Sequence, residues 1–548
     1  MARPVARPVA RLGTGKGAAM DSQVRHILAL SRRGLLRGGL GMAALAALQP
    51  GAARRALAQP AFGSNPFTLG VASGDPWPDG MVLWTRLAPA PLEGGGMPML
   101  AVPVAWDLAE DAGFRTIIRQ GEALARPELG HALHVELTGL PAGSSFHYRF
   151  RVGGWESPVG RTRTAPAADG SPRRLRFVNA GCQNYEHGFF SAWRHIAAED
   201  DLDFVFHYGD YIYEGGPRGG QPRRHNSAEV YSLEAYRNRY ALYKLDPDLA
   251  AAQAAHPFLP SFDDHEVDND WAGPFSEEDG SRRDRPAVPP EIFALRKQAA
   301  FQAWYEHMPL RPSQLPRGPE ITAYRGLRFG RLLEVSVLDT RSFRTDQPCG
   351  GATAASCPAR EDPAAQMIGP QQERWLSDRL RPGRARWSLL AQQVPMLQRD
   401  TGADTPRYAM DKWDGYPAAR DRLFARVQES GLQGLVVVSG DVHAAWAGTL
   451  LRDFARPERG AVGVEFTASS ISSGGDGTEH LPATPRILAR NPHLAFFNNR
   501  RGYTLHEVTA QTVTARFRAV AAVSHPAAAR EDRGYFAVEH GSPALNPG

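Results

Sequence analysis

Two short motifs, each preceded by an apolar run, constrain this chain more than any other feature. The motif GDYIY at 209–213 follows the apolar run 204–206, and the motif GDVH at 440–443 follows the apolar run 435–438. Short apolar runs that end in turn residues are typical of strands buried on both faces. In open α/β sheets, ligands bind beyond the carboxyl ends of such strands. Carboxylate, phenolate and imidazole groups delivered to one sheet edge predict a metal centre built for hydrolysis.

Other predicted strands of the same region also end in polar or ionisable residues. Between residues 172 and 525, predicted strands alternate with predicted helices, which is typical of an α/β domain. Besides the two motifs, the strand ends carry Cys182, the segment 263–270 and Asp339. One strand-end aspartate alone often caps the following helix. Five such strand ends in order along the chain favour a catalytic domain over 172–525.

The sequence on either side of this predicted catalytic domain has different patterns. Residues 62–165 contain short alternating strands separated by turn residues, which predicts an N-terminal fibronectin-like β-sandwich domain. Within it, Pro103 predicts that the strand at 102–106 lies at a sheet edge, because proline cannot donate to a strand ladder. Residues 526–548 are expected to form a C-terminal tail.

The first 58 residues have the order of a twin-arginine export signal. Arg32 and Arg33 are followed by a soft apolar stretch over 38–48 and by an A-x-A cleavage pattern at 56–58. We therefore expect export by the twin-arginine machinery to a periplasmic or secreted location. No apolar run reaches the length of about 18 residues that marks a membrane span, so no transmembrane anchor is expected.

Removal of this segment changes the charge of the chain. The full sequence carries a net charge of +5, and residues 1–58 contribute +9 from ten basic residues and Asp21. Subtracting +9 from +5 leaves −4 for the remainder. The sequence therefore gives no sign of a basic surface for nucleic acids, and no stable nucleic-acid partner is expected.

The three cysteines are consistent with an oxidising compartment. Cys349 and Cys357 are eight positions apart in a loop rich in glycine, alanine and proline, and they can pair. Cys182 is then left over, and it lies at a predicted strand end. When deprotonated, a thiol at that position is an anionic metal ligand.

The ordered motifs resemble those of the PhoD-type alkaline phosphatases, a branch of the calcineurin-like metallophosphoesterases related to purple acid phosphatases. The residues that carry the resemblance are GC at 181–182, GDYIYE at 209–214, DDHEV at 263–267, LDTR at 338–341 and GDVH at 440–443. Residues 67–89 also resemble the N-terminal module of this family. The resemblance covers essentially the whole mature chain. It implies an α/β fold with a four-layer αββα core, an N-terminal β-sandwich and a site for Fe3+ and Ca2+.

The resemblance also implies ligands for each ion. The residues that map onto the iron ligands are Cys182, Asp210, Tyr213 and His443. The residues that map onto the calcium side are Asp210 and Asp441, with either Asp264 or Asn269. Related phosphatases usually carry a Gly-Asn-His-Glu motif where this chain has DDHE at 263–266, so the choice between Asp264 and Asn269 stays open. Calcium prefers oxygen ligands, whereas thiolate and phenolate favour a highly charged ion such as ferric iron.

Two further side chains are expected to contact the substrate. His265 is predicted either to hold a phosphate oxygen or to protonate the leaving group. Arg218 is predicted to clamp phosphate, because a guanidinium matches phosphate oxygens in a fork. With a metal-bound hydroxide as the nucleophile, the predicted activity is that of an exported alkaline phosphatase that hydrolyses phosphate monoesters and some diesters.

Two other functions compete with this prediction. A phosphodiesterase or phospholipase D-like enzyme would use the same site in a wider cleft, and a comparison of monoester with diester substrates separates the two. A non-catalytic surface binding protein would retain metal and bind a polymer without turnover. The nearly complete set of ligands favours an enzyme over a binding protein.

Overall fold

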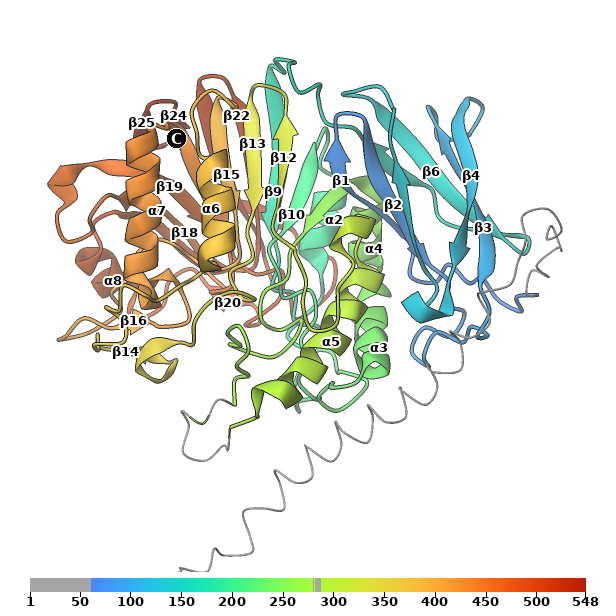
Figure 1. The fold of residues 1–548 in the computed structure, drawn as a ribbon, viewed down its shortest axis with the longest axis horizontal. Helices are drawn as coiled ribbons and strands as arrows, with labels where there is room; N and C mark the ends of the chain where they lie inside the picture. Colours follow the sequence, from blue (N-terminus) through green and yellow to red (C-terminus); the bar gives the residue numbers. More distant parts are fainter. Residues whose placement is uncertain (1–60, 279, 281–286) are drawn as a thin grey trace, which may run out of the picture.

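Two β-sheets packed face to face form the centre of the molecule, and helices cover their outer faces (Figure 1). The structure is a computed structural model that describes residues 61–278, 280 and 287–548. The predicted export signal at 1–58 lies outside the described residues. Within the described residues, no helix combines the length and the apolar character needed to cross a membrane.

The first sheet has ten strands in the order β25-β24-β23-β22-β9-β10-β11-β1-β2-β5. Their bounds, in the same order, are Ser542–Pro547, Arg530–Glu539, Thr512–Val520, Gly502–Thr509, Arg174–Ala180, Phe204–His207, Pro257–Pro260, Val71–Trp77, Gly80–Arg86 and Ala132–Leu137. Strands β9, β10, β11 and β1 run parallel to one another. The flanking strands β22 and β2 pair with this group antiparallel.

The second sheet has eight strands in the order β12-β13-β15-β17-β19-β18-β21-β20. Their bounds, in the same order, are Arg325–Phe329, Leu333–Val337, Trp387–Ala391, Leu435–Ser439, Ala461–Thr467, Ala445–Leu451, Leu494–Arg500 and Gly477–Thr478. Strands β13, β15, β17 and β19 are parallel, so this sheet also has a central parallel group.

Helices from two stretches of the chain cover the outer faces of the sheets (Figure 1). The helices are α2 (Ser191–Ala197), α3 (Leu233–Lys244), α4 (Pro247–Ala255), α5 (Pro290–His307), α6 (Gly369–Arg379), α7 (Pro417–Ser430) and α8 (Thr484–Arg490). Side chains of α2 to α5 share one buried cluster with β9 and β10, for example Trp193 with Val205. Side chains of α6 and α7 share another cluster with β15 and β17, for example Leu423 with Val437.

The central strands are apolar along their whole length because both of their faces are buried. In β17, Val436 and Val438 pack into the core between the sheets, whereas Leu435 and Val437 pack against the outer helices. Successive side chains of a strand point to opposite faces of its sheet. Here one face of each sheet packs on helices and the other face packs on the second sheet, so both faces need apolar residues. The resulting four layers confirm the predicted αββα core.

The N-terminal region forms a β-sandwich that shares a sheet with the core. Its second sheet contains β4 (Ile117–Ala125), β3 (Val102–Ala109), β6 (Ser145–Val152), β7 (Trp155–Glu156) and β8 (Gly160–Arg163). This sheet packs on β1, β2 and β5 through a separate buried cluster. Strand β1 pairs in parallel with β11, with Ser73 opposite Pro257 and Gly74 opposite Phe258. The sandwich is therefore a direct extension of the ten-stranded sheet.

Two sequence-based expectations differ from the structure. Strand β3 lies between β4 and β6 and is not at an edge. Its proline is tolerated because β6 pairs with β3 only from Ala105 onward, beyond Pro103. The segment 526–548, expected to be a tail, contains β24 and β25 of the ten-stranded sheet. Phe536 and Val538 of β24 face the core between the sheets, and their burial explains why this segment is ordered as a strand.

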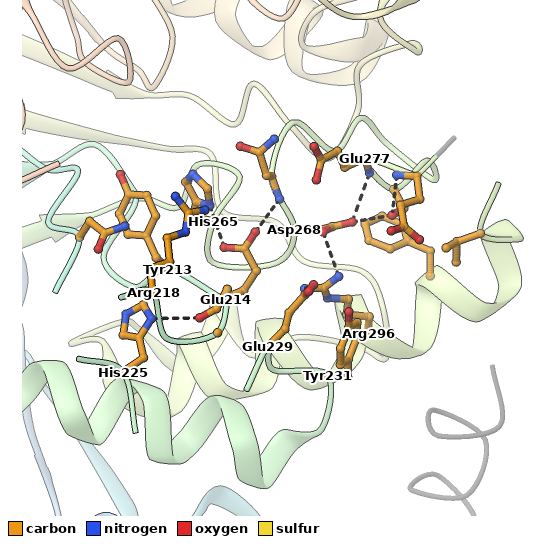
Figure 2. A pocket seen from close by; sticks show the side chains of 18 of the residues that line it. Tyr213, Glu214, Arg218, His225, Glu229, Tyr231, His265, Asp268, Glu277 and Arg296 are labelled. Atoms are coloured by element: carbon orange, nitrogen blue, oxygen red, sulfur yellow. Dashed lines mark hydrogen bonds and ion pairs between the residues drawn. The ribbon is translucent and has the colours of Figure 1, made fainter. Parts of the chain in front are cut away.

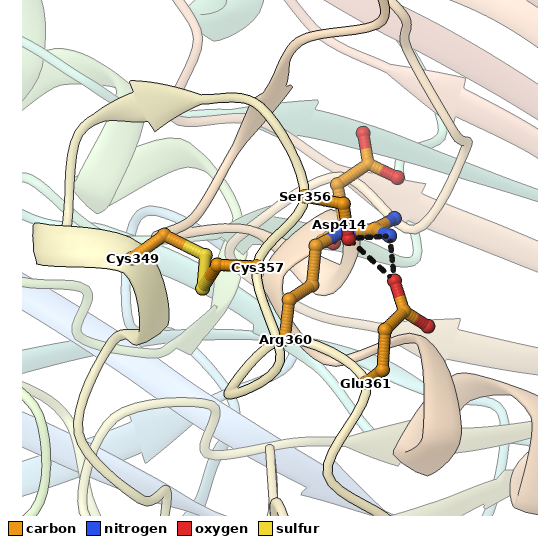
Figure 3. The surroundings of a disulfide bond; sticks show 6 residues. All are labelled: Cys349, Ser356, Cys357, Arg360, Glu361 and Asp414. Atoms are coloured by element: carbon orange, nitrogen blue, oxygen red, sulfur yellow. Dashed lines mark hydrogen bonds and ion pairs between the residues drawn. A yellow bond between two sulfur atoms is a disulfide. The ribbon is translucent and has the colours of Figure 1, made fainter.

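The disulfide between Cys349 and Cys357 forms as the sequence allows (Figure 3). The loop that it closes contains β14 (Thr353–Ala354), which pairs with β16 (Tyr408–Ala409). Arg360 anchors the loop by donating from Nε to the backbone oxygen of Asp414 at 2.6 Å. Cys182 is free and buried.

Replacing Gly74 with alanine is expected to weaken the junction between the sandwich and the catalytic sheet. A Cβ at this position would lie 2.4 Å from the backbone oxygen of Pro309 and 2.8 Å from that of Phe258. Relieving such overlap by backbone movement costs about 1–3 kcal/mol. Urea unfolding should show a fall of that size in the free energy of unfolding. A Cβ at Gly63 would have no atom within 4 Å, so Gly63→Ala should be as stable as the wild type. Equal stability of the two variants would contradict the tight junction.

Candidate metal centre

The motifs after the parallel strands meet in one small volume. One ligand atom from each of Cys182, Asp210 and His443 lies within 4.8 Å of the others. The Tyr213 hydroxyl lies 2.8 Å from Asp210 Oδ2 and 3.2 Å from His443 Nε2. The Cys182 thiol lies 3.2 Å from the same Asp210 oxygen. The structure therefore brings together all four residues predicted for the iron side.

Four residues in these loops adopt a backbone conformation that L-residues rarely use. The φ angle is +51° at Cys182, +54° at Asp210, +68° at Asp441 and +53° at His443. Non-glycine residues in the left-handed region cost of order 1 kcal/mol or more each, and they cluster at functional sites. The concentration of this strain at the predicted ligands indicates that the surrounding structure is built to hold these turns.

A group of carboxylates adjoins this volume. Asp264 belongs to three groups of residues whose ligand atoms all lie within 4.8 Å of one another. Its companions are Asp210 and His265 in the first group, Asp263 and Asp441 in the second, and Asp270 and Asp411 in the third. Asp264 therefore lies beside both Asp210 and Asp441, the two other residues predicted for the calcium side. Asn269 lines the neighbouring cavity, and its backbone N–H donates to Glu214.

Buried cations, among them Arg341 and Lys412, compensate part of this negative charge. The Arg341 guanidinium lies 2.5 Å from Asp263 Oδ1 and 3.3 Å from Asp264 Oδ2. The Lys412 ammonium contacts Asp441. Charges removed from water are tolerated only when they are paired and hydrogen-bonded. Arg341 and Lys412 therefore allow several carboxylates to stay close together inside the protein.

His265 and Arg218 line a cavity of about 340 Å³ beside the cluster (Figure 2). The rings of His265 and Tyr213 pack together with their centroids 4.0 Å apart. Arg218 is exposed, and its backbone N–H donates to both carboxylate oxygens of Glu186 at 3.1 Å. The two residues predicted to contact substrate therefore lie along one open space next to the candidate centre.

Two glutamates that sequence reasoning did not single out link the motif loops to each other. Glu266, from the loop after β11, accepts hydrogen bonds from the backbone N–H groups of Asp210 at 3.1 Å and Tyr211 at 2.6 Å. Glu214, from the loop after β10, lies 2.7 Å from His265 Nδ1. Glu214 belongs to the motif GDYIYE and Glu266 to the motif DDHEV. Residue type alone does not show whether such a glutamate supports a loop, binds a metal or lies on the surface.

The electrostatic environment of the donors favours a bound cation. Burial raises the pKa of Cys182 well above its usual value, and the Asp210 carboxylate raises it further. Burial also raises the pKa values of Tyr213 and Asp210. A positive ion in the shared volume would oppose these shifts by stabilising the anionic forms. Asp210 Oδ1 is buried and lacks a hydrogen-bond partner among the described residues, as expected of an oxygen placed for an ion.

The two histidines of the site differ in charge. Burial, with a smaller contribution from nearby Arg501, lowers the pKa of His443 to about 3, so this imidazole is neutral and offers a nitrogen lone pair. Burial also lowers the pKa of His265, but the carboxylates of Glu214 and Asp264 outweigh burial and hold this pKa well above its usual value. The arrangement fits His443 as a ligand and His265 as a proton carrier.

Comparison with known proteins assigns the chain to a family. Residues 177–517 match the PhoD-like phosphatases, and residues 51–166 match the N-terminal domain of the PhoD-like phosphatases. The chain belongs to the PhoD-like phosphatase family. It is 46% identical over 485 residues to alkaline phosphatase D of Bacillus subtilis (strain 168). The matched region covers 87% of this chain and 82% of that protein. A solved structure described as the structure of PhoD superposes with a TM-score of 0.86 at 44% identity, covering 89% of this chain and 93% of that chain.

Membership in the PhoD-like phosphatase family confirms the fold and the class of activity that the motifs predict. The chain is a phosphoric ester hydrolase with an αββα core and an N-terminal β-sandwich. The groups of acidic, cysteine and histidine side chains at the strand ends fit the metal dependence of such an enzyme.

Replacing Glu266 with glutamine is expected to loosen both motif loops. Glutamine has one carbonyl oxygen to accept hydrogen bonds, and its NH2 group would face backbone N–H donors. A buried donor left without an acceptor costs about 1–3 kcal/mol. The free energy of unfolding in urea should fall by about that amount, and the purified protein should hold less metal.

The matched control for this variant is Glu507→Gln on β22, where the carboxylate is on the surface and 41% of the side chain is exposed. This variant should keep wild-type stability and metal content. Wild-type behaviour of Glu266→Gln would show that the loops do not depend on the Glu266 carboxylate.

Proposed function

We propose that this chain hydrolyses phosphate monoesters, and some diesters, at a centre of two metal ions held by the strand-end side chains. The observation that carries the proposal is the convergence of Cys182, Asp210 and His443, whose ligand atoms lie within 4.8 Å. Phosphate monoesters hydrolyse extremely slowly in water. When bound, two metal ions at these side chains would neutralise charge on the phosphate oxygens and activate water.

The donor chemistry supports Fe3+ on one side and Ca2+ on the other. Cys182 and Tyr213 are anionic when deprotonated, and with neutral His443 they suit a highly charged ion. Asp441, with Asp264 or Asn269, offers only oxygen atoms, which Ca2+ prefers. The remaining carboxylate, Asp210, contacts Tyr213 of the first set through Oδ2 and lies beside Asp264 of the second, so it would be shared by the two ions.

The chain's own residues bind and orient the ester. Arg218 at the cavity wall offers its guanidinium to the phosphate oxygens. His265 lies between the candidate centre and the cavity, where it can give a proton to the leaving oxygen. The cavity accommodates the leaving group of a monoester or the second arm of a diester, and assays with p-nitrophenyl and bis-p-nitrophenyl phosphate measure which one the site prefers.

The bridging role of Asp210 is tested by Asp210→Asn. Loss of the carboxylate removes the negative charge that holds two ions together, and metal ions contribute several kcal/mol of charge stabilisation to such reactions. We expect kcat/KM for p-nitrophenyl phosphate to fall by about 10³-fold and metal content to fall with it.

Asp201→Asn is the matched control for Asp210→Asn, because Asp201 has the same φ of +54° and its side chain is 74% exposed. It should retain full activity and metal. Unchanged turnover and metal content in Asp210→Asn would refute the assignment of the site.

We infer further that the chain is exported, with a signal at 1–58, a β-sandwich at 62–165 and a catalytic domain that begins near 172. The order of arginine pair, apolar stretch and A-x-A pattern supports this inference. The disulfide between Cys349 and Cys357 also fits an oxidising compartment such as the periplasm.

Replacing Arg32 and Arg33 together with lysine should stop export, because the twin-arginine route recognises the paired guanidinium groups. Cell fractionation followed by immunoblotting should then show unprocessed protein in the cytoplasm. The same change at the second pair, Arg54 and Arg55, should leave export intact. Normal processing of the first variant would argue against this route.

A further inference from the structure

Gln347 connects the disulfide-closed loop to the carboxylates of the candidate centre. Its side chain stands two positions before Cys349 and donates from Nε2 to Asp411 Oδ1 at 2.8 Å and to the backbone oxygen of Asp270. Ligand atoms of Asp270 and Asp411 lie within 4.8 Å of a carboxylate oxygen of Asp264. One amide group therefore bridges two segments that supply carboxylates to the site.

The contact with Gln347 supports a turn of unusual backbone conformation. Asp270 has a φ of +51°, which L-residues rarely adopt and which needs support from the surroundings. Its backbone N–H donates to Asp264 Oδ2 at 2.9 Å, and its backbone oxygen accepts from Gln347. The turn carries both Asp264 and Asn269, the two alternatives for the Ca2+ ligand. The Gln347 amide is therefore placed to fix the orientation of that ligand.

The chain is anchored unequally on the two sides of Gln347. Before it, Arg344 is buried and donates to the backbone oxygens of Asp411 at 2.9 Å and Trp271 at 3.0 Å. After it, each residue from 349 to 359 is half-buried or exposed. A disulfide restrains a chain by removing conformational freedom from the residues that it closes. The cross-link therefore supplies a restraint that burial of side chains does not.

Both arms of the cross-linked loop contact the same segment, 411–414. Gln347 binds Asp411 on one arm, and on the other arm Arg360 donates to the backbone oxygen of Asp414 at 2.6 Å (Figure 3). Lys412 lies between these two contacts and pairs with a carboxylate of the proposed calcium side. A change in the cross-linked loop can therefore reach the site through this segment.

We propose that Gln347 is a positioning residue for the calcium side of the centre and that the disulfide between Cys349 and Cys357 holds it there, an inference that rests on the proposed function above. An external dithiol breaks the sulfur–sulfur bond by exchange. Its two thiols lose two protons and two electrons and become a disulfide, and the two cysteines gain them and become thiols. The freed loop lets Gln347 leave its acceptors, and Ca2+ binds more weakly. Calcium affinity is thereby higher in an oxidising compartment than in a reducing one.

Calcium binding to the purified holoenzyme tests this role, with Ca2+ alone as the probe. The protein is equilibrated in buffers of falling free Ca2+, and the calcium retained per chain is measured by elemental analysis. Gln347→Ala should reach half-saturation at about 10-fold higher free Ca2+, because it loses a hydrogen bond to a charged acceptor. Gln371→Ala, at an exposed position of α6, is the matched control and should bind Ca2+ as the wild type does.

Reduction of the disulfide should have the same effect as loss of the amide. Wild-type protein treated with dithiothreitol, and the double variant Cys349→Ser with Cys357→Ser, should each show a shift of about 10-fold. Adding dithiothreitol to Gln347→Ala should cause no further shift, because both changes remove one contact. Dithiothreitol should also leave the double serine variant unchanged, which controls for metal taken up by the reagent.

Hydrogen exchange separates positioning from a loss of structure confined to the loop. In reduced wild-type protein we expect faster exchange in peptides that cover 264–270 as well as in those that cover 349–359. Faster exchange in 349–359 alone, with unchanged calcium half-saturation, would overturn the inference. This measurement carries the test if the double serine variant does not fold, because the wild type is reduced after it has folded.

Failure of this inference differs from failure of the proposed function. Wild-type calcium binding in Gln347→Ala, beside lost turnover in Asp210→Asn, would overturn the positioning role and leave the function intact. Additive shifts from Gln347→Ala and reduction would show that the disulfide acts by another path and would overturn the link between them. Wild-type turnover in Asp210→Asn would instead overturn the proposed function.

Discussion

The geometry of the site depends on one buried carboxylate, that of Glu266. It accepts hydrogen bonds from the backbone N–H groups of Asp210 and Tyr211 after β10, and of Asp263 after β11. These are neighbouring parallel strands, paired from Val205 to His207 of β10. Backbone N–H donors at buried strand ends need acceptors, and here one carboxylate accepts all three hydrogen bonds. The left-handed turn at Asp210, and with it the convergence of the ligands, follows from that support.

The same sheet edge gathers buried carboxylates, a thiol and imidazoles in a small volume. Arg341 and Lys412 pair with carboxylates on the side of Asp264 and Asp441. On the side of Cys182 the nearby cation is Arg501, which donates to Ser470 and to the backbone oxygen of Ser473, and burial raises the pKa of the thiol. An arrangement of this kind is costly in an empty protein and favourable around positive ions. Electrostatics and geometry thus point to the same volume.

Much of the fold and the site could be predicted from sequence because the information is local. Apolar runs such as 204–206 indicate strands buried on both faces, and the residues after them must lie at the sheet edge. Other features depend on contacts between distant segments. Nothing near Gly74 indicates that β1 pairs with β11, and Pro103 gives a misleading edge signal because its strand is paired on one side only at that point. The roles of Glu214 and Glu266 depend on which loop each side chain reaches, which spacing alone does not determine.

The most direct test of the shared centre is an anomalous diffraction experiment on crystals of the purified protein, recorded across the iron absorption edge. We predict an iron peak enclosed by Cys182, Asp210, Tyr213 and His443, with a second ion beside Asp441. Maps with no ion in this volume, or with ions bound elsewhere while these side chains point apart, would contradict it.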